Sequence, residues 1–369
     1  DFPAIKPEHV VPSMKSLIQD AQEALKTSNA KETPATWDAV ITPLEQRTLK
    51  LSRAWGAVSH LMSVCDEPKL REAYNEALPI VTQFWIGLSQ SELSEKYKAI
   101  KESAEFKTLS ATRQRIINEE LKDFMLAGAF LPAKRKEQLK TVKETLAKES
   151  QKFSENLLDA TNAYGLLVEN KSDLAGIPED DIASFKEAAQ AAGQEGYRIT
   201  LQVPHYLAVM QYAQNRALRE TLYKAYVTRA SELDFDGRFN NNDVMRHIVE
   251  LRETEAKLLG FKNYGEVSLA TKMADTPQEV IAFLRDLAKR SLPQAKNDMK
   301  EVKQFARDTL KIDDPQSWDL PFASEKLRQA RYSYSDQEVK QYFTLPNVFN
   351  GLFGLVQTLF GIRIVPDTA

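Results

Sequence analysis

Apolar positions recur at helical spacing along most of the chain. Between Pro132 and Tyr164 they fall three, four or seven residues apart, at Leu139, Val142, Leu146, Phe153, Leu157 and Tyr164. Charged residues fill the positions between them, so this stripe predicts one long amphipathic helix. A helix of about 32 residues would be about 48 Å long, which suits the wall of a lobe. A free coiled coil is the alternative.

A second long helix is predicted to begin at Pro277. Thr276 can cap it, proline suits the first helical position, and Glu279 completes a capping box. Pro293 lies within the pattern and should kink or interrupt the helix, because proline removes a backbone donor. Thr42 to Glu45 carries a similar start signal. The preceding segment, Trp37 to Ile41, is also helical in pattern, so a kinked single helix is equally possible there.

One part of the chain has the pattern of a small sheet. Tyr164 to Val168 and Tyr197 to Val203 are short runs rich in β-branched and aromatic residues. A polar turn and a helix from about Glu179 separate them, and Pro204 should end the second strand. We therefore predict a mainly α, multi-helical protein with one two-stranded ribbon at about residues 164–168 and 197–203.

Composition supports this picture and excludes several classes of protein. The 369 residues include only 13 glycines, which leaves few positions for tight turns. With 49 Lys plus Arg against 52 Asp plus Glu, the net charge is −3, so no basic excess favours a nucleic acid or an anionic membrane as partner. No apolar run is long enough for a transmembrane helix. The single Cys65 excludes an intrachain disulfide.

The histidines do not form a zinc-peptidase motif. None of His9, His60, His205 and His247 precedes a glutamate, and no two are four residues apart, so His-Glu-x-x-His is absent. His247 and Glu250 could share a helix face. However, Leu251 occupies the position of the second histidine in the inverted motif, and a solvated face is the simpler interpretation.

Other catalytic patterns are incomplete. Asp234 to Gly237 suggests a calcium loop, but Met245 stands where such a loop needs glutamate, and a polar loop with Asn242 or Asp243 as helix cap fits better. Cys65, five residues from His60, is more typical of a small core residue than of a nucleophile. Neither a nucleophile elbow nor a phosphate-binding glycine loop is present. From motifs we assign no catalytic, cofactor-binding or metal-binding residue.

Two basic segments remain. Lys134-Arg135-Lys136 stands at a predicted helix start, where a solvated face is expected. A second group, Arg331, Tyr332, Tyr334 and Tyr342, could line a groove, although core and rim packing explains it equally well.

Several stretches nevertheless follow one family pattern. In chain order they are AIKPEHVVP at 4–12, VSHL at 58–61, LREAY at 70–74, LRETLYKAYVTRAS at 218–231, LLGFKNY at 258–264 and SLATKMA at 268–274. Trp318-Asp319 and Ser324-Glu325-Lys326 match as well. In these stretches the chain resembles the thimet oligopeptidase and oligopeptidase A family of zinc metallopeptidases. The resemblance covers the whole chain, but Pro321-Phe322-Ala323 departs from the paired tyrosines expected before the serine.

The resemblance implies a mostly helical fold of two lobes, which flank a deep channel that admits short peptides and excludes folded proteins. It places residues 1–131 plus 312–369 in the catalytic lobe and residues 132–311 in the opposing lobe. The family's zinc-binding motif lies beyond Ala369, so the chain is interpreted as an N-terminal segment, and no zinc ligand or general base is transferred to it.

The resemblance also implies a function for the intact protein. It would be a cytoplasmic zinc metallopeptidase that hydrolyses short peptides, using zinc to activate water. This segment would supply channel wall and size exclusion, bind no zinc itself and be inactive alone, with the C-terminal part of the same chain as its partner. The alternatives are a complete helical binding or scaffold module without activity, and a cysteine hydrolase that uses Cys65.

Overall fold

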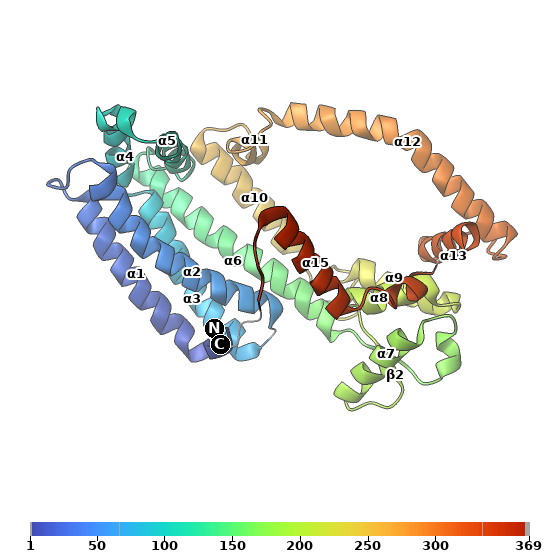
Figure 1. Ribbon diagram of the computed structural model, residues 1–369. Coiled ribbons are helices and arrows are strands. Elements are labelled where there is room, and N and C mark those ends of the chain that lie inside the picture. Colours follow the sequence, from blue (N-terminus) through green and yellow to red (C-terminus); the bar gives the residue numbers. More distant parts are fainter. Residues whose placement is uncertain (1, 66, 334, 366–369) are drawn as a thin grey trace. The chain divides into compact units, whose positions relative to one another are not determined.

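The computed structural model describes residues 2–65, 67–333 and 335–365, and helices dominate it (Figure 1). The predicted mainly α fold with a single two-stranded ribbon is confirmed for these residues. The chain divides into two compact units, and each is described by itself. Unit 1 comprises residues 1–155 and 242–283, and unit 2 comprises residues 156–241 and 284–369. The lobes expected from the resemblance, 1–131 plus 312–369 and 132–311, concern a complete enzyme and stay a prediction.

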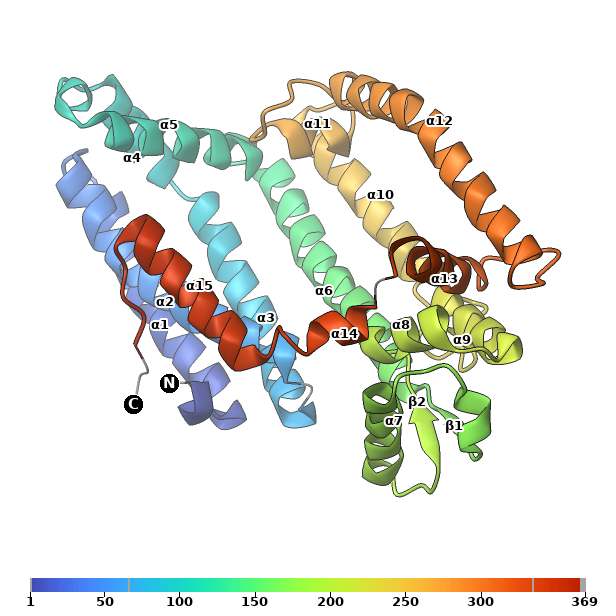
Figure 2. The same cartoon turned by 45° about the vertical axis from the view of Figure 1, so that its right-hand side comes forward.

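Unit 1 is a helical assembly around two apolar clusters. Its helices are α1 (Pro7–Asn29), α2 (Thr42–Val64), α3 (Pro68–Ser89), α4 (Leu93–Glu102), α5 (Ala111–Leu126), α10 (Asn242–Leu259) and α11 (Tyr264–Leu269). Helix α1 lies against α2 and α3 in both views (Figures 1 and 2). One cluster fills this contact with Val10, Met14 and Leu51, while the other surrounds Trp37, Ile100 and Ile117. These residues follow the helical period, because burial of one stripe drives the packing.

The sequence left open whether a new helix begins at Thr42 or one kinked helix begins at Trp37, and the structure has features of both. Trp37–Ile41 forms a π-helical turn that leads directly into α2 at Thr42. The Thr36 hydroxyl caps it by accepting the Ala39 N–H at 3.3 Å. Pro43 lacks a backbone donor, and the wider turn before it accommodates that gap without breaking the helix.

The two long helices predicted from periodicity are present. Helix α6 spans Ala133–Ala163 and α12 spans Pro277–Asp308. Thr276 caps α12 as predicted, because its hydroxyl accepts the Glu279 N–H at 3.2 Å. The Glu279 carboxylate accepts the N–H of Asp275, one residue before the cap, at 2.9 Å, so the capping box forms only in part. Pro293 does not interrupt the helix, which continues through it and curves along its length (Figure 1).

The ribbon belongs to unit 2 and is shorter than predicted. Strand β1 (Leu166–Val168) pairs antiparallel with β2 (Tyr197–Ile199), with Leu167 opposite Arg198. The expected extension of the second strand to Val203 is wrong, because Val203 begins helix α8 (Val203–Tyr212). Proline suits the first turn of a helix as well as the end of a strand, and Pro204 takes the former role.

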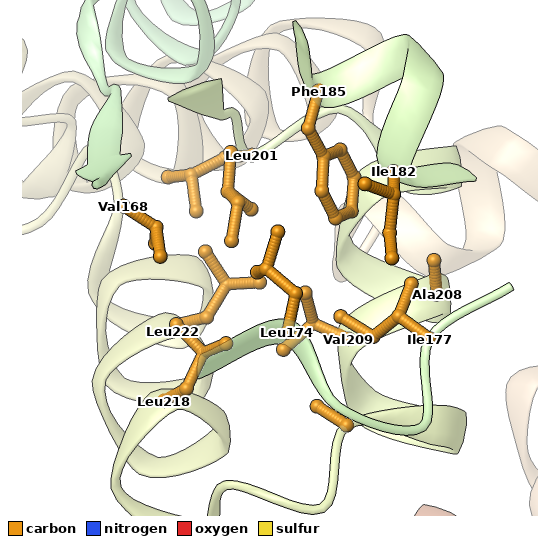
Figure 3. Close-up of a cluster of buried hydrophobic side chains, with 12 residues drawn as sticks. Val168, Leu174, Ile177, Ile182, Phe185, Leu201, Ala208, Val209, Leu218 and Leu222 are labelled. Atoms are coloured by element: carbon orange, nitrogen blue, oxygen red, sulfur yellow. The ribbon is translucent and has the colours of Figure 1, made fainter. Parts of the chain in front are cut away.

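The core of unit 2 joins this ribbon to the helices around it. Besides α8, the helices of this core are α7 (Glu179–Ala191), which begins where the sequence predicted, and α9 (Arg216–Thr228). Unit 2 also contains α13 (Leu320–Tyr332), α14 (Asp336–Lys340) and α15 (Leu345–Phe360). Figure 3 shows side chains of α7, α8 and α9 converging on Leu174, Phe185 and Leu201. Helix α13 packs against α8.

Candidate functional site

The histidines and Cys65 have separate surroundings. His9 Nδ1 accepts the Lys6 N–H at 3.3 Å, and the centre of the His60 ring lies 5.3 Å from that of the Phe2 ring. Cys65 is exposed at the end of α2, so its interpretation as a core residue is wrong. In the described part of the chain, no three His, Cys, Asp or Glu side chains converge to hold a metal. The zinc that the resemblance implies therefore has no fitting set of donors among these residues.

The other motifs identified in the sequence also take up local contacts. His247 Nδ1 lies 3.3 Å from the Glu149 carboxylate. This contact joins α10 to α6, and it does not involve Glu250. Asp236 pairs with Arg238, and Asp234 accepts the Ala230 N–H at 3.1 Å.

The two basic segments differ in their contacts. Lys136 donates to the Gln90 carbonyl at 3.4 Å. Arg331 pairs with Glu301, Tyr332 and Tyr342 are exposed, and Tyr334 lies outside the described residues. Tyr332 and Tyr342 are therefore not core residues, and the groove stays a prediction.

One serine–histidine pair has the partners of a catalytic dyad but the wrong tautomer. His205 is 8% exposed, and its Nε2 lies 3.0 Å from the Ser184 hydroxyl. The Thr200 N–H donates to Nδ1 at 3.2 Å, so in the neutral ring the proton is on Nε2. Nε2 then donates to Ser184 and cannot accept the serine proton, which a general base must do. The pair therefore serves packing between α7, β2 and α8.

His205 gives unit 2 a predicted pH dependence. Burial lowers the pKa of His205 below its ordinary value of 6.5. The unfolded chain then binds more protons than the folded chain once the pH falls to about that value, so stability decreases as acidity increases. We expect His205→Gln to flatten the stability change between pH 7 and pH 5, measured by urea unfolding. His60→Gln, on an exposed histidine, is the control, and an unchanged pH slope in His205→Gln would contradict the assignment.

The most highly connected polar group of unit 2 is Asp319 with two arginines. Asp319 is 0% exposed at the start of α13, and Arg219 on α9 is 1% exposed. Arg219 Nη2 donates to the carboxylate at 2.7 Å, and Arg216 donates through Nε at 3.1 Å and through Nη2 at 2.8 Å. The Gln316 N–H adds a further bond at 3.0 Å.

The remaining donors of Arg219 are also paired. Its Nη1 donates to the Ala213 carbonyl at 2.6 Å, its Nε donates to the Trp318 carbonyl at 3.2 Å, and the guanidinium stacks over the Phe322 ring at 4.3 Å. Burial alone would raise the pKa of Asp319, but the hydrogen bonds from Arg216, Gln316 and Arg219 outweigh it and hold that pKa below its usual range. Because every group is satisfied, the cluster fixes α9 to α13 and has no free base or nucleophile.

Two helices present apolar side chains that nothing described covers. No residue of α15 is buried, although the helix is LPNVFNGLFGLVQTLF. On α12, residues 281–300 are all exposed, including Phe283 at 66%, Leu284 and Leu287. We call these surfaces the open faces of α12 and α15. No described helix is both long and apolar enough to span a membrane. Contiguous exposed apolar surface of this kind usually marks an interaction site.

Comparison with known proteins defines the class. The neurolysin/thimet oligopeptidase N-terminal domain matches residues 14–161, and peptidase family M3 matches residues 209–369. The chain thus belongs to peptidase family M3, and the family predicted from the sequence is confirmed.

Individual relatives extend this match along the whole chain. Oligopeptidase A of Haemophilus influenzae is 41% identical over 99% of the chain and 54% of its own length. Oligopeptidase A of Escherichia coli is 39% identical over 98% of the chain and 53% of its own length. A probable cytosolic oligopeptidase A of Arabidopsis thaliana is 38% identical over 99% and 53%. The chain spans about half the length of these curated relatives.

Proposed function

We propose that this chain is the N-terminal, non-catalytic part of a cytoplasmic, zinc-dependent oligopeptidase. In the complete enzyme it supplies channel wall and limits peptide size, while the zinc ligands and general base lie in sequence beyond it. Relatives named oligopeptidase A, one of them described as cytosolic, support the reaction class and the location.

The open face of α15 carries this proposal. Burial of apolar surface stabilises a protein by about 25 cal/mol for each Å² removed from water. The exposed apolar surface of this 16-residue helix therefore favours a covering partner. The chain accounts for about half of each relative, so the remaining half is the natural source of that cover. By the same argument the open face of α12 is a second contact for the C-terminal part.

The gene sequence downstream of Ala369 provides a direct test. A His-Glu-x-x-His run in the same reading frame supports the proposal, because that spacing places two imidazoles on one helix face. A stop codon directly after Ala369 would contradict it and favour a complete helical scaffold.

The open face of α15 predicts self-association of the isolated chain. We expect oligomers whose fraction rises with concentration in sedimentation velocity, because exposed apolar surfaces cover each other. Phe349→Glu with Leu352→Glu places charges on neighbouring turns of this face and should shift the chain toward monomer. Gln357→Glu adds a charge to an exposed polar position of the same helix and is the control. A wild-type chain that stays monomeric at all concentrations would contradict this prediction.

A further inference from the structure

A cavity of about 190 Å³ lies in unit 1, among the turn that precedes α2 and helices α2 to α5. Four aromatic side chains line it, namely Trp37, Trp85, Tyr97 and Phe124, and two carboxylates reach it, Glu45 and Glu120. A cavity of about 150 Å³ can hold a molecule of the size of benzene. The cavity therefore has room for a small organic group with an apolar body.

The polar groups of the cavity lack a positive partner. Glu120 is half-buried and forms no ion pair with a described residue. Burial raises its pKa, and the nearby negative charges of Asp123 and Glu45 raise it further. Carboxylates that share a poorly solvated site repel each other, and a cation placed between them removes this cost. The charge pattern thus favours a positively charged occupant.

Tyr97 provides a second, independent observation. Only 6% of this residue is exposed, it lines the cavity, and its hydroxyl forms no hydrogen bond with a described residue. The hydroxyl oxygen itself keeps contact with solvent, so it is free to accept a hydrogen bond from a molecule in the cavity. Its ring meets Phe124 edge to face at 5.3 Å, so packing fixes the direction in which the hydroxyl points.

The aromatic walls suit a cation as well. The Arg113 guanidinium already stacks over the Trp37 ring at 4.8 Å, so this ring takes part in a cation–π contact within the protein. A hard metal ion fits less well, because calcium or magnesium requires about six oxygen ligands, and no metal-binding group of three acidic or histidine side chains occurs among the described residues.

We propose that this cavity binds an organic cation, a primary ammonium or guanidinium group carried on a short aliphatic stem. Glu120 and Glu45 neutralise the charge through charge-assisted hydrogen bonds, and the Tyr97 hydroxyl accepts a further N–H. The rings of Trp37 and Trp85 pack against the stem. A free amine and the side chain of a peptide lysine or arginine carry the same chemistry.

The test is a titration of the 369-residue chain with n-butylammonium and n-butylguanidinium chloride, followed by calorimetry and tryptophan fluorescence. Butyrate and n-butanol have the same stem without the positive charge. The proposal expects saturable one-to-one binding of at least one cation and none of butyrate or butanol. It is overturned if neither cation saturates, or if butyrate or butanol binds equally well.

Variants connect the binding to these residues. Glu120→Gln keeps the shape of the side chain and removes its charge, so we expect affinity for the cation to fall about tenfold or more. Glu119→Gln is the matched control, because Glu119 pairs with Lys122 at 3.1 Å outside the cavity. Tyr97→Phe should also weaken binding without loss of packing. Equal affinity in Glu120→Gln and Glu119→Gln would refute the site, and a thermal melt of each variant confirms that it is folded.

The source of the cation is resolved by a peptide arm of the titration. If acetyl-Gly-Lys-Gly-amide or its arginine counterpart binds more tightly than the free amines, the natural ligand is a basic side chain of a peptide or protein. Tighter binding of the free amines identifies a small-molecule amine, and both results uphold the cation site.

Discussion

Replacing Asp319 with alanine is expected to destabilise unit 2 by about 3–5 kcal/mol, the range observed when one partner of a buried ion pair is removed. Asp319 is inaccessible to solvent, and Arg219 would remain buried with one of its donors unpaired. Arg216 is about half exposed, so its guanidinium can turn toward water.

Amide hydrogen exchange can localise the loss. In Asp319→Ala, peptides from α9 and α13 should lose protection, because the lost hydrogen bonds join these helices. Peptides from α1, α2 and α3 in unit 1 should be unchanged. Urea unfolding then gives the size of the free-energy change, provided that the transition of unit 2 is resolved from that of unit 1.

Two further variants make this prediction specific. Asp313→Ala removes an exposed carboxylate from the same loop and should change stability by no more than about 0.5 kcal/mol. Arg216→Ala should cost less than Asp319→Ala, since Asp319 would keep its bonds from Arg219 and Gln316. Equal stability of Asp319→Ala and Asp313→Ala would show that the cluster does not hold α9 to α13.

The pH dependence of this effect has a defined sign. The pKa of Asp319 is held below its ordinary value of 3.8 in the folded chain, so its stabilisation is complete above that value. It is lost as the pH falls through the lower pKa of the folded state. The difference between wild type and Asp319→Ala should therefore be largest near neutral pH and shrink in strong acid.

Local patterns predicted most of the fold. The stripe through Leu139 and Val142 and the capping box at Thr276 specify α6 and α12, because helix formation depends on neighbours in sequence. The error at Val203 arose where strand and helix signals overlap around Pro204. Pro293 was expected to kink or interrupt its helix, and the helix continues through it as a curved helix.

The polar cluster and the cavity were not predicted, because their members are distant in sequence. Arg219 and Asp319 are 100 residues apart, and each occurs in a stretch that contributed to the family resemblance without a recognisable motif. The cavity draws on residues from Trp37 to Phe124, which helical packing brings together. A charged residue on an otherwise apolar helix face, such as Arg219, is the one sequence signal that indicates a buried pair.

A large gain in peptide hydrolysis is expected when the chain is extended to the length of its relatives. The described residues supply no group of donors for zinc, whereas enzymes commonly accelerate their reactions by a factor of about 10⁶ or more. Extension should also cover α15, so protection of its amides against hydrogen exchange should rise together with activity.

Turnover of a quenched fluorescent decapeptide by the purified 369-residue chain, with and without added zinc, shows whether catalysis needs the downstream part of the protein. The chain extended by its downstream coding sequence is the positive control, and a zinc chelator identifies metal-dependent cleavage. We predict no turnover above background for the 369-residue chain and chelator-sensitive turnover for the extended chain. Chelator-sensitive turnover by the 369-residue chain alone would show that this segment is itself catalytic and that the proposed division of roles is wrong.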